Sequence, residues 1–190
     1  MSMKVLEVGD RKLRGRNKPV QKIDSEKTLL IIDKLEKIIL KRKLYSLSAP
    51  QIGESKRIFC TKIPKDHLRV FINPEIIRTS SKKVNVKVSC PSIAKGNLAF
   101  EVIRSEYITI QAYDRKGRFF RLEADGELSY EIEHMIDHLD GVLLFDKFTN
   151  PKSIETVKNL QFRKPIKSKL IDFSFLEKPP LSPTPDSYVE

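Results

Sequence analysis

The feature that most restricts the fold is a series of six short β-type segments between residues 57 and 123, with a helical segment on either side. The turn sequences NP, KGN and DRKG separate the segments. The segment EYITIQAYD alternates polar and apolar residues, as a half-buried strand does. This arrangement predicts an α+β fold with short strands in antiparallel or mixed sheets. The six segments are 57–63, 68–74, 84–90, 100–104, 106–114 and 118–124.

Residues 24–42 have the periodicity of an amphipathic helix. Asp24 or Ser25 is a suitable N-cap, and basic residues fill the last turn, where they favour the helix dipole. The following segment, LYSLSAPQIG at 44–53, is expected to be a loop. The apolar stripe of the helix is expected to be core and not a binding site; it consists of Leu29, Ile32, Leu35 and Ile39.

Residues 126–139, GELSYEIEHMIDHL, predict a second helix. A third, basic helix is expected at 151–162, because Pro151 suits the first turn of a helix. We expect a single domain over residues 1–165. The C-terminal segment 166–190 is basic and then proline-rich, which is typical of extended or disordered chain.

The net charge of the 190-residue chain is +11 and is unevenly distributed. Residues 11–22 carry six basic side chains and no acid, and residues 152–169 carry six basic side chains and one acid. Such segments favour contact with an anionic surface such as the ribosome. The alternative is an ordinary lysine-rich, solvated surface.

Two cysteines, Cys60 and Cys90, do not make a disulfide framework in a chain of this length. No apolar run approaches the roughly 20 residues of a membrane span. The polar, basic start does not resemble a secretory signal. We therefore expect a reduced protein of the cytoplasm, or of an organelle matrix if a transit segment has been removed.

His134 and His138 are four residues apart in the predicted second helix, so their imidazoles lie on one face and can share a metal ion. The alternative is that both histidines are surface or core residues. Cys90 follows a predicted strand and offers a thiolate. Two imidazoles and one thiolate leave a fourth tetrahedral position open, as in catalytic metal sites.

With these residues in view, the chain resembles the peptide deformylases over about residues 3–165. The three motifs that carry the resemblance are LYSLSAPQIG, VSCPSI and EHMIDHLDGVLLFD. The resemblance implies sheets packed around a central helix, with one divalent ion held by Cys90, His134 and His138. That ion is commonly Fe²⁺, with Zn²⁺, Ni²⁺ or Co²⁺ as substitutes. The implied substrate is an N-formyl-methionyl peptide or another peptide N-terminus, and the implied oxyanion donor is Gln51.

Two residues depart from the family pattern at catalytic positions. Met135 occupies the place of the glutamate that handles the proton, and a thioether is no base. Pro91 occupies the place of a residue whose backbone N–H stabilises the oxyanion, and proline has no N–H. The glycine-rich loop has also changed, so Tyr45 and Ser46 are expected to reshape the groove that binds the substrate peptide.

A stripe of the second helix is formed by every third or fourth residue: Glu127, Tyr130, Glu131, His134 and His138. The resemblance implies that the first three line the pocket for the methionine side chain. The alternative is that they are solvent-facing substitutions. If chemistry survives, Glu131 is the candidate for a relocated carboxylate. It would be a fourth metal ligand, a displaced base or, with Glu127, a selector of cationic side chains.

Four other residues have simpler interpretations. Arg104 matches a family arginine at the pocket rim, or else is a plain surface charge. Asp137 is expected to orient a metal ligand or an arginine. Cys60 is expected to be an inert buried thiol, and His67 an exposed loop residue.

Three functions follow from these features. The first is an N-formyl-methionyl deformylase with weak or altered activity. The second is a metal-binding pseudoenzyme that binds the ribosome, a nascent chain or another anionic partner. The third is a ribosome-associated or RNA-binding protein whose metal is structural. The retained ligands and Gln51 favour the first two, while Met135 and Pro91 favour the second over the first.

Overall fold

The computed structural model describes residues 4–150, 152, 154–156 and 168–171. All six predicted β segments form strands, and each pairing between named strands is antiparallel. The prediction of an α+β fold is therefore confirmed. The six strands are β2 (Ile58–Thr61), β3 (Arg69–Thr79), β4 (Lys83–Ser89), β5 (Leu98–Ser105), β6 (Tyr107–Tyr113) and β7 (Phe119–Asp125).

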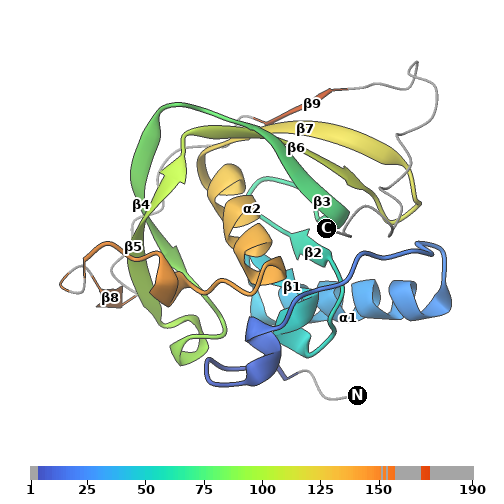
Figure 1. Ribbon diagram of the computed structural model, residues 1–190, viewed down its shortest axis with the longest axis horizontal. Coiled ribbons are helices and arrows are strands. Elements are labelled where there is room, and N and C mark those ends of the chain that lie inside the picture. Colours follow the sequence, from blue (N-terminus) through green and yellow to red (C-terminus); the bar gives the residue numbers. More distant parts are fainter. Residues whose placement is uncertain (1–3, 151, 153, 157–167, 172–190) are drawn as a thin grey trace, which may run out of the picture.

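The strands of the described chain form two sheets. The larger has the order β1-β2-β3-β6-β7-β9, with β1 (Ser46–Ser48) and β9 (Ser168–Ile171) at its edges. The smaller has the order β4-β5-β8, with the short β8 (Glu155–Thr156) at one edge. In Figure 1 the two sheets curve around one central helix, α2.

The central helix α2 (Gly126–Leu139) begins directly after β7, within the bounds that the sequence predicts. The first helix, α1 (Glu26–Arg42), packs beside β1 and β2. Its N-cap is Ser25, whose hydroxyl accepts a hydrogen bond from the Thr28 backbone N–H. Leu29 is only partly buried, and Ile31 and Ile38 join the buried stripe instead.

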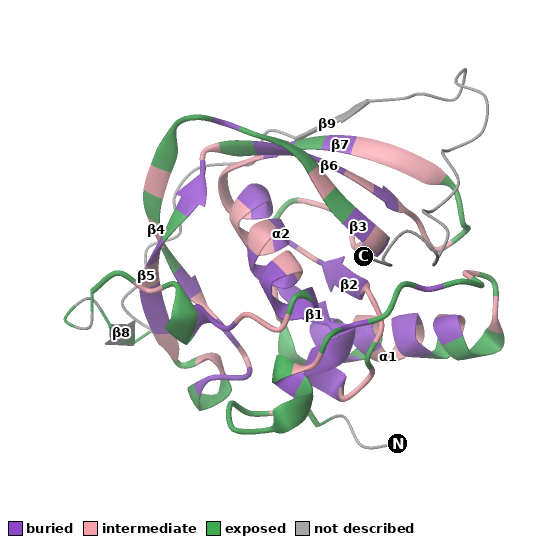
Figure 2. Ribbon diagram, viewed as in Figure 1, coloured by how far each residue is buried: buried purple, intermediate pink, exposed green. Residues whose placement is uncertain are grey.

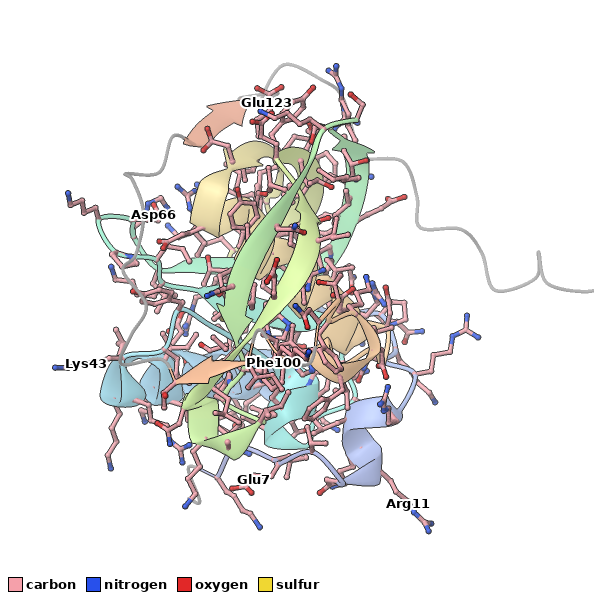
Figure 3. All side chains as sticks on the ribbon, turned by 90° about the vertical axis from the view of Figure 1, so that its left-hand side faces the viewer. Glu7, Arg11, Lys43, Asp66, Phe100 and Glu123 are labelled. Carbon is pink, nitrogen blue, oxygen red and sulfur yellow. The ribbon has the colours of Figure 1, made fainter. Side chains whose placement is uncertain are left out.

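Three clusters of buried side chains hold these elements together, and Figure 2 shows buried residues concentrated on α2 and on the strands around it. The first cluster joins α1 to β1 and β2. The second joins α2 to the larger sheet, and the third lies between β4, β5 and the short helix η4 (Leu144–Asp146). Phe100, which is labelled in Figure 3, belongs to the third cluster. Its ring centroid lies 5.2 Å from that of Phe145.

Two local predictions are wrong. Segment 44–53 is not a loop but contains β1 and the short helix η2 (Ala49–Ile52). Residues 155 and 156 of the predicted helix 151–162 form β8, because their backbone groups pair with the edge of β5 at Leu98 and Ala99. Residues 151, 153 and 157–162 lie outside the described residues. Of the C-terminal segment 166–190, residues 168–171 form β9, and the rest lies outside the described residues.

Candidate metal centre

Two adjacent faces of α2 have different roles. One face packs against the larger sheet, and its fully buried apolar side chains are Leu128, Ile132, Met135 and Leu139. The other face carries His134 and His138, which are also buried. The loop that follows β4 brings Cys90 against this second face. Residues 44 positions apart in the chain therefore meet between the two sheets.

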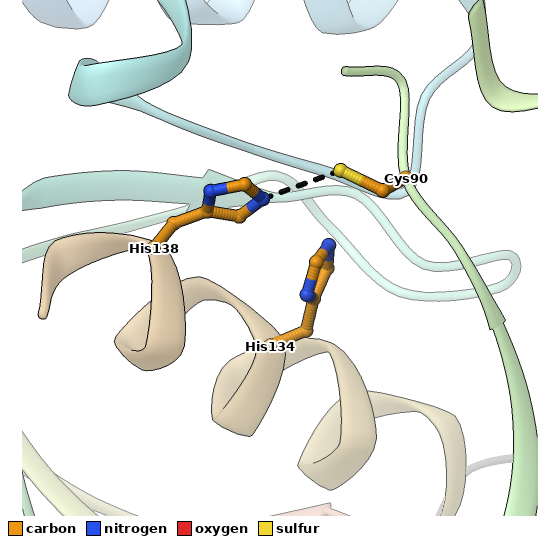
Figure 4. Close-up of side chains that lie close together, drawn as sticks. All are labelled: Cys90, His134 and His138. Atoms are coloured by element: carbon orange, nitrogen blue, oxygen red, sulfur yellow. Dashed lines mark hydrogen bonds between the residues drawn. The ribbon is translucent and has the colours of Figure 1, made fainter. Parts of the chain in front are cut away.

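Cys90, His134 and His138 form one compact cluster, and each is at most 1% exposed (Figure 4). Their potential ligand atoms all lie within 4.8 Å of one another. Cys90 Sγ is 3.2 Å from His138 Nε2, and the two imidazole centroids are 4.7 Å apart. The predicted ligand set is thus brought together at a single point.

The donors of this cluster fit a divalent transition metal. Neither ring nitrogen of His134 has a hydrogen-bond partner in the described structure, and neither does His138 Nδ1. Burial, reinforced by the charge of Arg104, lowers the pKa of His138 to about 4. Burial also lowers the pKa of His134 well below its ordinary value. Both imidazoles are therefore neutral at physiological pH, as metal ligation requires. Burial also raises the pKa of the Cys90 thiol to about 12, and a coordinated cation would favour its thiolate.

Gln51 lies directly beside the cluster and is fully buried. Its Oε1 accepts hydrogen bonds from both the backbone N–H and the hydroxyl of Ser48. Its Nε2 is 3.6 Å from Cys90 Sγ and donates to the Ser92 hydroxyl at 3.1 Å. The amide is therefore oriented with its N–H groups toward the cysteine loop.

The two departures from the family pattern have definite places. Met135 is fully buried among the apolar side chains between α2 and the larger sheet. Pro91 directly follows Cys90 and supplies no backbone N–H to the site. Neither residue offers a proton acceptor or a hydrogen-bond donor.

Arg104 is 2% exposed, so the alternative of a plain surface charge is wrong. Its Nη1 lies 2.7 Å from an oxygen of Asp137, and the other oxygen of Asp137 binds Lys147 Nζ at 2.7 Å. Asp137 therefore orients an arginine, which was one of its two expected roles. Arg104 Nε and Nη2 have no hydrogen-bond partner in the described structure.

Of the remaining residues of the α2 stripe, Glu131 contacts β1 through Ser46, and Glu127 lies near Tyr45. Glu127, Tyr130 and Glu131 are all partly buried, so each is only partly in contact with solvent. Glu131 accepts a hydrogen bond from the Ser46 hydroxyl, and burial raises the pKa of Glu131 to about 7. Burial, followed by the charges of Glu127 and Glu131, raises the pKa of Tyr45. Among the described residues the compact ligand cluster excludes Glu131, so the fourth-ligand alternative has no support.

Sequence reasoning missed some residues that support the site. Ser92 binds Gln51, and its only sequence signal was its place in the cysteine loop. Asn17 is buried and donates to the backbone oxygens of His138 and Leu139 at the end of α2. No local pattern marks Asn17, because its partners are more than 120 residues away.

Two residues lie outside the site, as expected. Cys60 is a free thiol in β2, fully buried, and burial raises its pKa well above the ordinary value. His67 is exposed beside Asp66. Neither takes part in the metal cluster.

The fold and the site together define a class of protein, in which a central helix and the end of a neighbouring strand present two imidazoles and one thiol to a metal ion. Comparisons with known proteins agree with this class. A family model described as polypeptide deformylase matches residues 2–153. The chain therefore belongs to the peptide deformylase family, which is metal-dependent and acts on N-formyl-methionyl peptides.

Individual relatives give the same result. The peptide deformylase of Halothermothrix orenii is 36% identical over 146 residues, covering 76% of this chain and 92% of that protein. The peptide deformylase of Clostridium botulinum is 38% identical over 141 residues, covering 74% and 92%. The crystal structure of the Synechococcus elongatus peptide deformylase in complex with actinonin superposes with a TM-score of 0.73 at 32% identity, covering 78% of this chain and 80% of that one. Among the described residues, no helix is both long and apolar enough to span a membrane.

Proposed function

We propose that this chain is a divalent-metal-dependent hydrolase of N-formyl peptides that acts slowly on N-formyl-methionyl substrates. The observation that carries the proposal is the buried cluster of Cys90, His134 and His138, with the amide of Gln51 beside it. Family membership supports the same reaction. Fe²⁺ or Zn²⁺ is the proposed ion, with Ni²⁺ or Co²⁺ as substitutes, because thiolate and imidazole ligands suit these metals.

In this reaction water adds across the formyl C–N bond, formate leaves, and the peptide amine takes up a proton. A divalent ion supplies Lewis acidity, which lowers the pKa of a coordinated water to about 7. The Gln51 amide, held in place through Ser48, supplies N–H groups for the developing oxyanion. Asp137 holds the Arg104 guanidinium, and the charge of Arg104 helps to keep both imidazoles neutral.

Two missing groups are expected to slow the reaction. Met135 has no atom that accepts a proton, and positioned proton transfer contributes about 10²–10⁴ in rate. Pro91 has no N–H, and one oxyanion donor contributes about 10²–10³. The effects of two losses within one active site seldom multiply fully. The product of these two factors is therefore an upper limit on the reduction in rate.

The test is hydrolysis of formyl-Met-Ala-Ser by anaerobically purified protein of measured metal content. We expect the turnover rate to lie below the usual enzyme range of ~1–10³ s⁻¹. Met135→Glu should raise it by about 10²–10⁴, because it restores a base, whereas Met135→Gln has a similar shape without a base and should not. A wild-type rate within the usual range would contradict the proposal. Thermal midpoints of both variants should be measured, because position 135 is fully buried.

A metal-binding pseudoenzyme is the second candidate, and the enclosure of Met135 in the apolar core favours it. Its proposed partner is the ribosome. A surface cavity of about 460 Å³ at the end of α2 is lined in part by Arg14, Arg16 and Arg57. Arg14 is ion-paired with Asp146, and Arg57 with Asp140, which also lines the cavity, so this surface has mixed charge. Most of segment 152–169 lies outside the described residues.

We predict that the chain co-sediments with ribosomes at low salt and that this binding weakens at high salt, because exposed charges are screened. Replacing four basic residues of 152–169 by glutamine should weaken binding more than replacing the four lysines of α1, which are Lys27, Lys34, Lys37 and Lys41. Absence of binding at low salt, or binding indifferent to salt, would argue against a ribosomal partner.

We retain the single domain over 1–165 and a location in the cytoplasm or an organelle matrix as predictions.

A further inference from the structure

The α2 face that carries the metal cluster continues into two carboxylates. Glu131 is one turn before His134 and Glu127 is one turn before Glu131, so all three side chains project from one side of the helix. Strand β1 lies against this side of α2, and Ser46 of β1 donates its hydroxyl hydrogen to Glu131. The carboxylates are therefore held between α2 and β1, beside the metal cluster.

Neither carboxylate has a basic partner within the described part of the chain. Glu131 accepts only the neutral hydroxyl of Ser46, and Glu127 makes no hydrogen bond or ion pair there. Arg104 is the cation whose charge acts on Glu131, but its guanidinium is paired with Asp137 at 2.7 Å. Burial raises the pKa of both Glu127 and Glu131, and the charge of Glu127 adds to the rise at Glu131. Among the described residues, neither of these partly buried acids is thus paired directly with a cation.

A second observation connects this acidic pair to a ligand. His134 is 1% exposed, yet neither of its ring nitrogens has a partner in the described structure. It lies one turn from Glu131 on the same face and belongs to the metal cluster. A substrate amide at the metal would therefore place its neighbouring side chain next to these acids.

We propose, on the basis of the proposed hydrolase function, that Glu127 and Glu131 make the site select N-formyl peptides whose first residue has a cationic side chain, lysine or arginine. A cation there would provide the missing counter-charge, and the phenol of Tyr45 would lie beside it. An apolar side chain would leave two partly buried carboxylates without a cationic partner, which is unfavourable. Complementary charge of this kind determines specificity by favouring one substrate and penalising the other.

The test compares formyl-Lys-Ala-Ser with formyl-norleucyl-Ala-Ser, which has an apolar side chain without the ammonium group. We expect kcat/KM of the metal-loaded protein to be at least tenfold higher for the lysyl peptide. Glu127→Gln with Glu131→Gln should remove that preference. Glu123→Gln is the matched control, because Glu123 is exposed on β7, and it should retain the preference. Equal kcat/KM for both peptides, or a lysyl preference unchanged in the double variant, would overturn the inference.

Calorimetric binding of the same two peptides separates this inference from the proposed function. If neither peptide is hydrolysed, the hydrolase proposal fails, and the selectivity is then judged from Kd. Tighter binding of the lysyl peptide that is lost in Glu127→Gln/Glu131→Gln supports the selectivity. Equal binding of both peptides refutes it. Comparison of the lysyl and norleucyl peptides on the wild-type protein tests the selectivity even if the double variant does not fold.

Discussion

At the scale of single residues, Cys90 is the group whose ionisation depends most on a bound cation. Its thiol is 1% exposed, and burial raises its pKa to about 12. A metal ion held by Cys90, His134 and His138 would favour the thiolate form of Cys90. The same burial keeps His134 and His138 neutral, so all three side chains are prepared for one ion.

We predict that His138→Ala purifies with much less metal than the wild type, because a tridentate site loses one of its three ligands. His67→Ala is the matched control, since His67 is exposed and lies outside the cluster. Elemental analysis of the three proteins, purified side by side, gives the result. Equal, near-zero metal in wild type and His138→Ala would refute the proposed ligand set.

At the scale of elements, the C-terminal end of α2 determines where the second imidazole lies. The last carbonyl groups of a helix have no partner within the helix. Here the buried Asn17 donates to the carbonyl oxygens of His138 at 3.4 Å and Leu139 at 2.9 Å. The N-terminal segment thereby positions a metal ligand that lies 121 residues away in the chain.

We predict that Asn17→Ala lowers the free energy of unfolding by about 1–3 kcal/mol, because the buried carbonyl of Leu139 loses the Asn17 donor, while that of His138 keeps the Gly141 N–H. It should also weaken metal binding, since His138 is less well held. Asn85→Ala on the exposed side of β4 should change stability by no more than about 0.5 kcal/mol. Denaturant titration and metal titration of both variants provide the measurements, and equal effects of the two would show that Asn17 has no special role.

At the scale of the whole molecule, the metal cluster joins the two sheets. Cys90 belongs to the buried cluster of β4 and β5, whereas the sheet-facing residues of α2 belong to that of the larger sheet. An ion that binds only the folded state stabilises it by about 2.7 kcal/mol when the free metal concentration is 100 times Kd. The ion is thus expected to stabilise the contact between sheets as well as to serve chemistry.

We predict that removal of the ion by a chelator lowers Tm by roughly 5–11 °C, the shift that about 2.7 kcal/mol produces in a protein of this size. Restoring the metal should reverse the shift. His138→Ala should show little response to the chelator. A wild-type Tm that is indifferent to chelation would mean that the cluster contributes nothing to holding the sheets together.

Local patterns predicted much of this protein. Short β-rich segments separated by turn sequences predicted the six central strands, and the four-residue spacing of His134 and His138 predicted their shared helix face. The alternation in segment 106–114 predicted a half-buried strand, but Thr109 on its polar side is buried as well. Helix α2 was found with its predicted bounds. These predictions succeeded because period and turn chemistry act between residues that are close in the chain.

The errors came from contacts between residues distant in sequence. Nothing local predicts that Ser46–Ser48 form a strand, because β1 exists through pairing with β2. The same holds for β8, which requires the edge of β5. The edge strand of a sheet has unpaired backbone N–H and C=O groups that can pair with any segment lying beside it. Tertiary structure therefore determines which segment forms the next strand.

The sequence by itself determined the chemical inventory of the site: the Cys90 thiol, two imidazoles four residues apart, and no base at position 135. Only the tertiary structure decided how that inventory is arranged. It buried Arg104 against Asp137, placed Met135 in the apolar core and held Glu131 against Ser46. The physical reason is that burial and the absence of a counter-charge depend on the elements packed around a residue, and those elements come from distant parts of the chain.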